Sequence, residues 1–399
     1  MLHDTYIRRT KQWRATDPSA ERGLHPDSCG QYVRRHEQVG ELSFISRHPL
    51  RCPFPPFPAF NQRGVLMSDH SVFRPEWLEF ENELGFRPLL LGPTYEDLLE
   101  QYRHNLFKVT KKYGLPSPDQ TVSVSDETTA TGVRLRVYSP PNHKLNQPIV
   151  CYFHGGGLVL GTVEEDDALV RRYAKDTGLV FVSVEYRLAP YDPYPTGFGD
   201  CIDAAEWCIG HAADYGAKPA TVLLMGVSAG ATLALATSLN LISHRKTGQL
   251  QGVVAIHPFT IHPDVVPGEI QRSYKSYMEH NGRSVYTKAA MRTLLELHGS
   301  PKTDPFIFPA YSRLLKKLPC VYLAGCEIDT LRDDARIFKE LLVDDHVLHE
   351  YHEYTGLPHC FFAYPSPYLE KPREEYFRKT AAGIKFVLDS SEIPAIPLS

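Results

Sequence analysis

Short runs of consecutive apolar residues alternate along most of this chain with longer segments of helical periodicity. The apolar runs lie at residues 148–153, 179–184, 221–225, 253–256 and 320–324, with a more polar run at 347–351. Between them, the helical segments lie at residues 166–175, 202–213 and 231–241. A strand that is apolar on both sides must be covered on both faces, which is typical of a parallel sheet flanked by helices. The alternation therefore predicts an α/β fold on a mostly parallel sheet.

Two stretches do not follow this alternation. Residues 72–115 have helical periodicity ahead of the first strand, and residues 262–312 hold polar and aromatic side chains. Both could fold over the sheet as a cap. Residues 122–124 and 133–138 predict two more strands, and the alternating charge of the second favours a half-exposed antiparallel strand at the sheet edge.

The N-terminal region differs from the rest of the chain. Residues 1–66 lack sustained apolar periodicity, and their proline-rich stretch at 53–58 forbids helix and favours extended structure. We expect a flexible extension over residues 1–66, a single domain over residues 67–390 and a short tail over residues 391–399. A mitochondrial presequence is an alternative for the extension, but its acidic residues argue against it. Because Met67 follows directly, a dispensable extension or a start there is a further hypothesis.

Composition and charge exclude several classes of function. The chain holds 43 Lys and Arg against 47 Asp and Glu, a net charge of −4 that gives no global reason to bind nucleic acid. It has no apolar run of about 18 residues, so we expect no membrane span. The start lacks the apolar segment of a secretory signal, and the eight cysteines include no CxxC pair. Since Cys151 and Cys320 lie in apolar runs, we expect core cysteines and a reducing, cytoplasmic location.

The segment 226–230, Gly-Val-Ser-Ala-Gly, lies between an apolar strand and a helical segment. A serine at such a turn is held on a strained backbone at the carboxyl end of the sheet, where open α/β sheets bind ligands. Small neighbours let the chain fold back sharply, and the next helix points its first amides at the site. We therefore predict that Ser228 is a nucleophile. The alternative is a turn selected only for tightness.

A second glycine-rich turn, His154-Gly155-Gly156-Gly157, follows another apolar strand. Glycines let the backbone approach a substrate closely, and the amides of Gly156 and Gly157 could converge with that of Ala229 on a developing oxyanion. A phosphate-binding loop is the alternative, but the chain has no Gly-Lys-Ser/Thr there. We expect Gly155 and His154 to support the loop, and His154 to do so by hydrogen bonding rather than by proton transfer.

A nucleophilic serine needs a base, and the base needs an orienting acid. In folds with this turn the chain order is nucleophile, acid, histidine. Asp329 lies in the loop after the strand at 320–324 and is the predicted acid, with Glu327 as its alternative. His359 lies in a loop after the last predicted strand and is the predicted base.

Other ionisable residues have structural explanations. The acidic pair at residues 333–334 is expected to begin a helix and to favour its dipole. The acidic run at 164–167 is most simply another helix start, with a general-acid pair as the alternative. His346, His349 and His352 could together hold a metal ion, but strand alternation puts His349 on the opposite face from the other two. We expect no metal.

With these motifs the chain resembles the hormone-sensitive-lipase-like branch of the α/β-hydrolase superfamily over about residues 90–390. Three further stretches carry the resemblance: Tyr186-Arg187-Leu188-Ala189-Pro190 with Pro193-Tyr194-Pro195, Asp329-Thr330-Leu331-Arg332-Asp333, and His359-Cys360-Phe361-Phe362. The resemblance implies an eight-stranded sheet flanked by helices, a helical cap from about 72–115 and 262–312, and ester hydrolysis without a cofactor. It also implies these roles: Ser228 nucleophile, Asp329 orienting acid, His359 base, and Gly156, Gly157 and Ala229 oxyanion donors.

The chain departs from the family pattern at four positions. Val227 stands where the family often has Asp, and Ala231 stands where a further glycine often follows. Thr330 replaces a common proline, and Cys360 replaces a frequent glycine. None of these changes removes an atom of the predicted triad. The first two bear on the shape of the turn and of the acyl pocket.

We predict a serine hydrolase that cleaves esters with small to medium acyl groups through an acyl-enzyme intermediate. A thioesterase, lactonase or acyltransferase would use the same three residues. A small-molecule receptor with a vestigial site is an alternative of another class; some family relatives became receptors after losing the histidine, whereas His359 is present here. The aromatic residues of 262–312 favour a bulky or aromatic group in the substrate, and the sequence leaves the natural substrate and the oligomeric state open.

Overall fold

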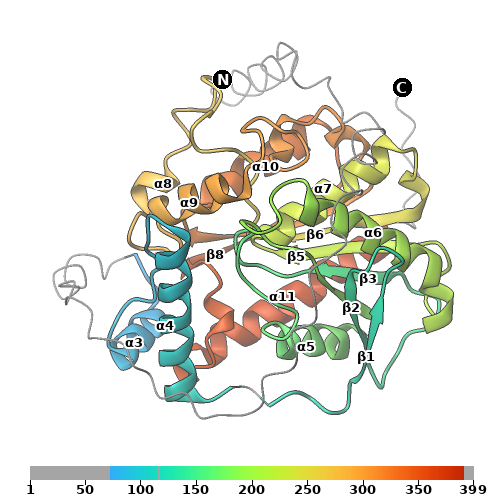
Figure 1. Ribbon diagram of the computed structural model, residues 1–399, viewed down its shortest axis with the longest axis horizontal. Helices are drawn as coiled ribbons and strands as arrows, with labels where there is room; N and C mark the ends of the chain where they lie inside the picture. Colours follow the sequence, from blue (N-terminus) through green and yellow to red (C-terminus); the bar gives the residue numbers. More distant parts are fainter. Residues whose placement is uncertain (1–71, 116, 391–399) are drawn as a thin grey trace, which may run out of the picture.

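The computed structural model describes residues 72–115 and 117–390 (Figure 1). The predictions for an extension over residues 1–66, a start at Met67 and a tail over residues 391–399 lie outside the described residues. Eight strands form one sheet in the order β1-β2-β4-β3-β5-β6-β7-β8. They are β1 (Ser123–Thr128), β2 (Arg134–Ser139), β3 (Ile149–Phe153), β4 (Phe181–Glu185), β5 (Val222–Val227), β6 (Leu250–Ile256), β7 (Val321–Ile328) and β8 (His349–Pro358).

The strands from β4 across to β8 run parallel, and β1 and β2 add an antiparallel end. The predicted α/β-hydrolase fold with a mostly parallel, eight-stranded sheet is confirmed. The prediction that residues 133–138 form the edge is wrong, because β2 lies between β1 and β4. The charged residues of β2 have partners at the solvent-exposed surface of the next strand: Arg134 and Arg136 both donate to Asp126 of β1. Ion pairing across two strands therefore produced the pattern that was interpreted as an edge.

Helices cover both faces of the sheet (Figure 1). α5 (Asp167–Thr177) and α11 (Glu370–Asp389) lie on one face, and α6 (Thr196–His211), α7 (Ala229–Ser243) and α10 (Arg332–Asp344) lie on the other. Short 3₁₀ turns complete this part of the chain: η3 (Ala212–Tyr215), η4 (Thr247–Gln249), η5 (Pro309–Tyr311), η6 (Leu315–Lys317), η7 (Phe361–Ala363) and η8 (Pro367–Leu369). Within the described ranges, no helix has the length and apolar character needed to cross a membrane.

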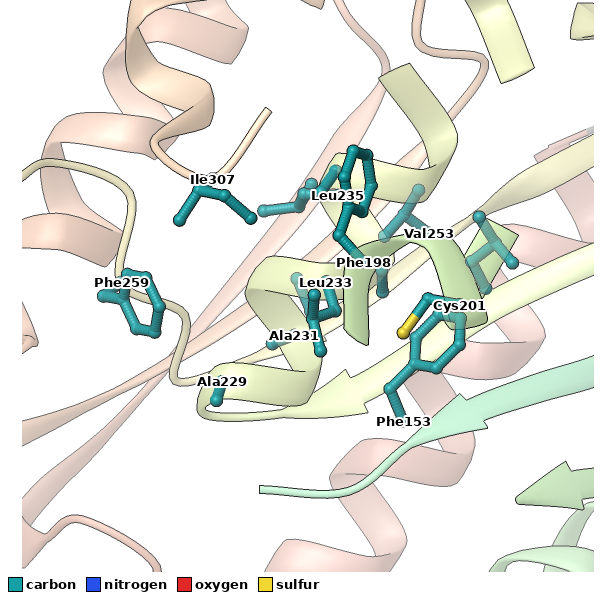
Figure 2. Packing of buried hydrophobic residues seen from close by; sticks show 14 of the residues in the cluster. Phe153, Phe198, Cys201, Ala229, Ala231, Leu233, Leu235, Val253, Phe259 and Ile307 are labelled. Carbon is teal, nitrogen blue, oxygen red and sulfur yellow. The ribbon is translucent and has the colours of Figure 1, made fainter. Parts of the chain in front are cut away.

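Each central strand supplies side chains to two separate cores. In β3, Cys151 and Phe153 belong to the core beneath α6 and α7, whereas Val150 and Tyr152 belong to the core beneath α5 and α11. Successive side chains of a strand point to opposite faces, so a strand covered twice must be apolar at every position. Figure 2 shows part of the first core, with labelled residues from β3, α6, α7 and β6. The described cysteines are free thiols, and all of them except Cys360 are buried.

Two stretches outside the alternation lie together at one end of the sheet (Figure 1). α3 (Pro75–Leu84) and α4 (Tyr95–Tyr113) come from the N-terminal stretch, and α8 (Ser276–Glu279) and α9 (Lys288–His298) come from residues 262–312. Leu90 pairs with Tyr286 in an isolated parallel bridge, and α4 contacts α9. Segments nearly two hundred residues apart in the sequence thus form one structural element at the carboxyl ends of the parallel strands.

Candidate active site

Ser228 occupies the sharp turn between β5 and α7. Its backbone has φ 55° and ψ −120°, a region that is costly for a residue with a side chain. Two glycines make this turn possible, because a Cβ on Gly226 would lie 2.2 Å from the Gly230 carbonyl carbon, and one on Gly230 would lie 1.9 Å from the Phe153 oxygen. The Ser228 amide donates to the carbonyl of Ile256 in β6 at 2.7 Å, which ties the turn to the sheet. The predicted strand-to-helix turn therefore holds the serine rigidly at the carboxyl end of β5.

The imidazole of His359 lies between Ser228 and Asp329. His359 Nε2 is 2.9 Å from Ser228 Oγ, and His359 Nδ1 is 2.5 Å from Asp329 Oδ2. With the proton on Nδ1, the ring donates to the carboxylate and accepts the serine hydroxyl at Nε2. These three residues, distant in the sequence, are therefore joined by two successive hydrogen bonds.

Each member of the buried His359–Asp329 pair stabilises the charge of the other. Burial disfavours the imidazolium, but the neighbouring Asp329 carboxylate holds the pKa of His359 well above 6.5. Burial also disfavours the carboxylate, but the charge and hydrogen bond of His359 hold the pKa of Asp329 below 3.8. The pair is thus suited to an imidazole that accepts a proton while its acid stays ionised.

The second oxygen of Asp329 is fixed by other donors. Asp329 Oδ1 accepts from Ser284 Oγ at 3.0 Å and from the amide of Leu331 at 3.1 Å. Glu327, the alternative acid, instead accepts from the amide of Gly356 at 2.8 Å. Of the two candidate acids, the structure therefore places Asp329 against the imidazole.

The glycine-rich loop after β3 lies against the serine turn. A Cβ on Gly155 would lie 3.6 Å from the Cβ of Ser228, an ordinary van der Waals contact, so the two backbones approach closely at this point. Gly156 and Gly157 have φ 112° and 65°, and both accordingly need the freedom of glycine. Ala229 is the first residue of α7, where the amide has no partner within the helix. All three predicted oxyanion donors thus flank Ser228 in sequence or belong to the loop packed against it.

His154 stabilises the loop from beneath. Its Nδ1 is 2.7 Å from the carbonyl of Gly155, and its ring stacks on Tyr186 with centroids 4.2 Å apart. The Tyr186 hydroxyl also donates to the His154 carbonyl at 2.8 Å. The amide of Ala189 donates to the carbonyl of Leu158 in the same loop. Burial lowers the pKa of His154 to about 4, so its ring is neutral near pH 7. These contacts match the predicted supporting role.

Sequence reasoning missed two aromatic neighbours of His359. The ring of His257 lies 5.3 Å from that of His359, and its Nε2 is 3.3 Å from Cys326 Sγ. Burial and the charge of His359 lower the pKa of His257 to about 3. The ring of Tyr286 is nearly perpendicular to that of His359, with centroids 5.1 Å apart. The position of His257 just after an apolar run was an available signal, whereas Tyr286 and Ser284 lie in a stretch without a motif.

The three histidines considered for a metal are not the group that the fold brings together. His349 and His352 lie on β8, and His346 lies in the turn before it. Among the described residues, the group close enough to share an ion is His257, His359 and Cys360, with ligand atoms within 4.8 Å of one another. Because this group includes His359, an ion there would compete with the hydrogen bonds to Ser228 and Asp329.

A cavity of about 220 Å³ adjoins this site. It lies between α4, the glycine-rich loop, the start of α5 and the segments that hold Tyr286 and Cys360. Its lining residues are Leu90, Tyr102, Asn105, Leu106, Val109, His154, Gly155, Gly156, Gly161, Thr162, Glu165, Asp166, Leu169, Val227, Val285, Tyr286, Cys360, Phe362, Ala363 and Tyr364. Two departures from the family pattern, Val227 and Cys360, are therefore part of this wall.

The acidic run at 164–167 has more than one role. Asp167 begins α5, as predicted, and pairs with Arg171 one turn later. Asp166 is the N-cap residue of the same helix, and Glu165 and Asp166 also line the cavity. The interpretation as a helix start is therefore confirmed for Asp167 and incomplete for the two residues before it.

Comparison with known proteins gives consistent matches. A family model described as the alpha/beta hydrolase fold matches residues 150–363. A versiconal hemiacetal acetate esterase from Aspergillus parasiticus is 35% identical over 315 residues, which are 79% of this chain and 98% of that protein. An arylesterase from Saccharolobus solfataricus is 30% identical over 58% of this chain and 73% of that protein. Among solved structures, an esterase from the archaeon Pyrobaculum calidifontis has a TM-score of 0.66 at 27% identity, covering 79% of this chain and 98% of that one.

Proposed function

Since this chain belongs to the α/β-hydrolase family, in the branch related to hormone-sensitive lipase, and is an ester-hydrolysing enzyme, we propose that it is a serine esterase for small to medium acyl groups. The proposal rests chiefly on one observation, the two hydrogen bonds that join Ser228 to His359 and His359 to Asp329. A hydroxyl in contact with a neutral imidazole can lose its proton as it attacks a carbonyl.

The proposed reaction has two halves. His359 takes the proton of Ser228 while Oγ attacks the ester carbonyl, and it then protonates the leaving alcohol to give an acyl-enzyme. Water attacks the acyl group with His359 again acting as base, which releases the acid and restores the serine. Asp329 fixes the imidazole tautomer and stabilises its cation through both steps.

The oxyanion of each tetrahedral intermediate needs donors close to Ser228. We assign this role to the amides of Gly156, Gly157 and Ala229. The dipole of α7 adds to their effect, because the amino end of a helix favours negative charge. One such donor contributes about 2.7–4 kcal/mol to the stabilisation of the transition state.

The cap and the cavity bear on substrate size. We propose that residues 72–115 and 262–312 act as a cap, since both contribute walls to the cavity of about 220 Å³. One relative is an esterase of an acetate ester and another is an arylesterase, which supports a short acyl group and an aromatic alcohol part. Thioesterase, lactonase and acyltransferase activity would use the same residues and are separated by product analysis. A cytoplasmic location remains a prediction.

The test is hydrolysis of p-nitrophenyl acetate and butyrate by Ser228→Ala. We expect kcat to fall by several orders of magnitude, because the nucleophile is removed. Ser238→Ala is the matched control, since Ser238 is a buried serine of α7, the helix that follows Ser228, and its hydroxyl donates to the carbonyl of Leu235. A Ser228→Ala protein that keeps most of its rate would refute the proposal.

A further inference from the structure

The cavity beside Ser228 combines an apolar wall with one polar end. Leu90, Val109, Leu169 and Phe362 line it together with aromatic rings, whereas Glu165 and Asp166 stand at the start of α5. An inference about which ester fits here rests on the proposed function. It concerns a feature that hydrolysis itself does not require, because neither carboxylate belongs to the Ser228–His359–Asp329 chain of hydrogen bonds.

The two cavity carboxylates have different partners from their neighbours in the acidic run. Glu164 pairs with Arg134 at 2.7 Å, and the next residue outside the cavity, Asp167, likewise pairs with an arginine. Glu165 instead accepts from the hydroxyl of Tyr102, and Asp166 accepts from that of Tyr152 at 2.7 Å. A carboxylate has about four acceptor sites on its two oxygens, so each retains capacity for a further donor.

Glu165 is exposed and Asp166 is half-buried, and partial removal from water already acts on both groups. Desolvation raises the pKa of Asp166 to about 6 and raises the pKa of Glu165 above its usual value. A ligand that fills the cavity would exclude more water from them. A polar group that loses water without gaining a partner costs free energy, and the cost is larger for a charged group.

His154, another residue that lines the cavity, has an acceptor atom without a partner. It is 1% exposed, and its Nε2 has no hydrogen-bond partner in the described part of the chain. Because Nδ1 lies 2.7 Å from the Gly155 carbonyl, it carries the proton of the neutral ring, and Nε2 is left as an acceptor. His154 Nε2 and the carboxylates of Glu165 and Asp166 are therefore acceptor atoms on residues that line the cavity.

We propose that the cavity selects esters whose aromatic alcohol part carries a hydroxyl group, which donates its one hydrogen bond to a carboxylate of the Glu165–Asp166 pair. The apolar walls accommodate the ring, and the hydroxyl supplies the donor that the carboxylates need once water is excluded. A site built to receive a hydroxyl discriminates strongly against an analogue without one, because its own polar groups are left unpaired. Glu165 and Asp166 are thus specificity-determining residues.

The test compares 3-hydroxyphenyl acetate with 3-methoxyphenyl acetate. The two meta substituents have similar electronic effects on the leaving phenol, so intrinsic reactivity is matched; the esters differ in the donor and in one methyl group, and the loss of the preference in Glu165→Leu assigns it to the donor. We expect the wild-type protein to prefer the hydroxyl compound by about 10- to 100-fold in kcat/KM, the range for a hydrogen bond to a charged group. Glu165→Leu should reduce this ratio about 10-fold or more, and Asp166→Asn should reduce it in the same direction.

Glu164→Gln is the matched control, because Glu164 is the adjacent carboxylate and binds Arg134 rather than lining the cavity. It should keep the wild-type ratio. Since both esters are measured on one protein sample, the ratio does not depend on the fraction of a variant that folds. Equal rates for the two esters in the wild type, or an unchanged ratio in Glu165→Leu, would overturn the proposal.

Two further measurements distinguish a failure of the proposed function from a failure of the specificity proposal. If the wild-type protein hydrolyses neither phenyl acetate nor p-nitrophenyl acetate, the proposed function itself fails. If it hydrolyses both and shows no hydroxyl preference, only the specificity proposal fails. A stronger preference for 3-(aminomethyl)phenyl acetate than for the hydroxyl compound would identify a cationic ligand and would contradict recognition of a hydroxyl.

Discussion

Gly156→Ala is the substitution that most sharply tests the role of the glycine-rich loop. Gly156 has φ 112°, and a Cβ there would lie 1.9 Å from the oxygen and 2.4 Å from the carbon of the Leu160 carbonyl. Real Cβ contacts essentially never fall below 3.0 Å, so the backbone must move by about 1 Å. The 2.9 Å hydrogen bond from the Leu160 amide to the Gly156 carbonyl leaves little freedom for that movement.

The expected cost follows from the loss of one well-placed oxyanion donor. Such a donor contributes ~2.7–4 kcal/mol to the transition state, which corresponds to about a 100- to 1,000-fold fall in kcat. Substrate binding involves the neutral carbonyl, so KM should change far less. The assay is steady-state hydrolysis of p-nitrophenyl acetate, with circular dichroism to verify folding.

Gly210→Ala is the matched control for this experiment. Gly210 lies near the end of α6, and a Cβ there meets nothing within 4 Å. Alanine should raise helix stability by about 0.5–1 kcal/mol and leave the rate unchanged. A folded Gly156→Ala protein with a rate within about 3-fold of wild type would refute the assignment of this loop to the oxyanion, because it would contradict the ~2.7 kcal/mol minimum.

The remaining predictions concern the imidazole and its supports. The pKa of His359 is held well above 6.5, and only the neutral ring can accept a proton, so kcat/KM should rise with pH through a midpoint above 6.5. A midpoint below 6.5 would show that Asp329 does not raise the pKa of His359. Asp329→Asn removes the charge that raises this pKa, so it should move the midpoint to lower pH and reduce kcat by about 10⁴-fold, while Glu327→Gln should change neither. The opposite pattern would make Glu327 the orienting acid. Tyr186→Phe removes the 2.8 Å hydrogen bond to the His154 carbonyl and should cost about 1 kcal/mol in urea unfolding; unchanged stability would show that this bond does not hold the loop.

The sheet and the serine turn could be predicted because local rules determine them. A strand covered on both faces, such as β3, must be apolar at successive positions, and this pattern is visible in a single sequence. The turn at Ser228 is equally local, since Gly226 and Gly230 are required by contacts within a few residues and by the adjacent strand β3. The position of β2 in the sheet was misjudged, because the partner of a charged strand is not encoded locally.

The parts of the site that sequence reasoning missed depend on tertiary contacts. Ser284 reaches Asp329 from a segment without recognisable periodicity, and Tyr286 joins the same site through its bridge to Leu90. α6 begins at Thr196 rather than near residue 202, where the apolar period first becomes clear. The two roles of the acidic run could not be separated either, because the partners that distinguish them come from other segments.

The central claim is that the hydroxyl of Ser228 is a nucleophile activated by His359. Treatment of the active protein with a fluorophosphonate, followed by mass spectrometry of its peptides, measures this directly. We predict one phosphonyl group on Ser228, added in parallel with the loss of esterase activity, and little labelling of a His359→Ala protein. Loss of activity with the label on another residue, or full activity in a protein labelled at Ser228, would contradict the claim.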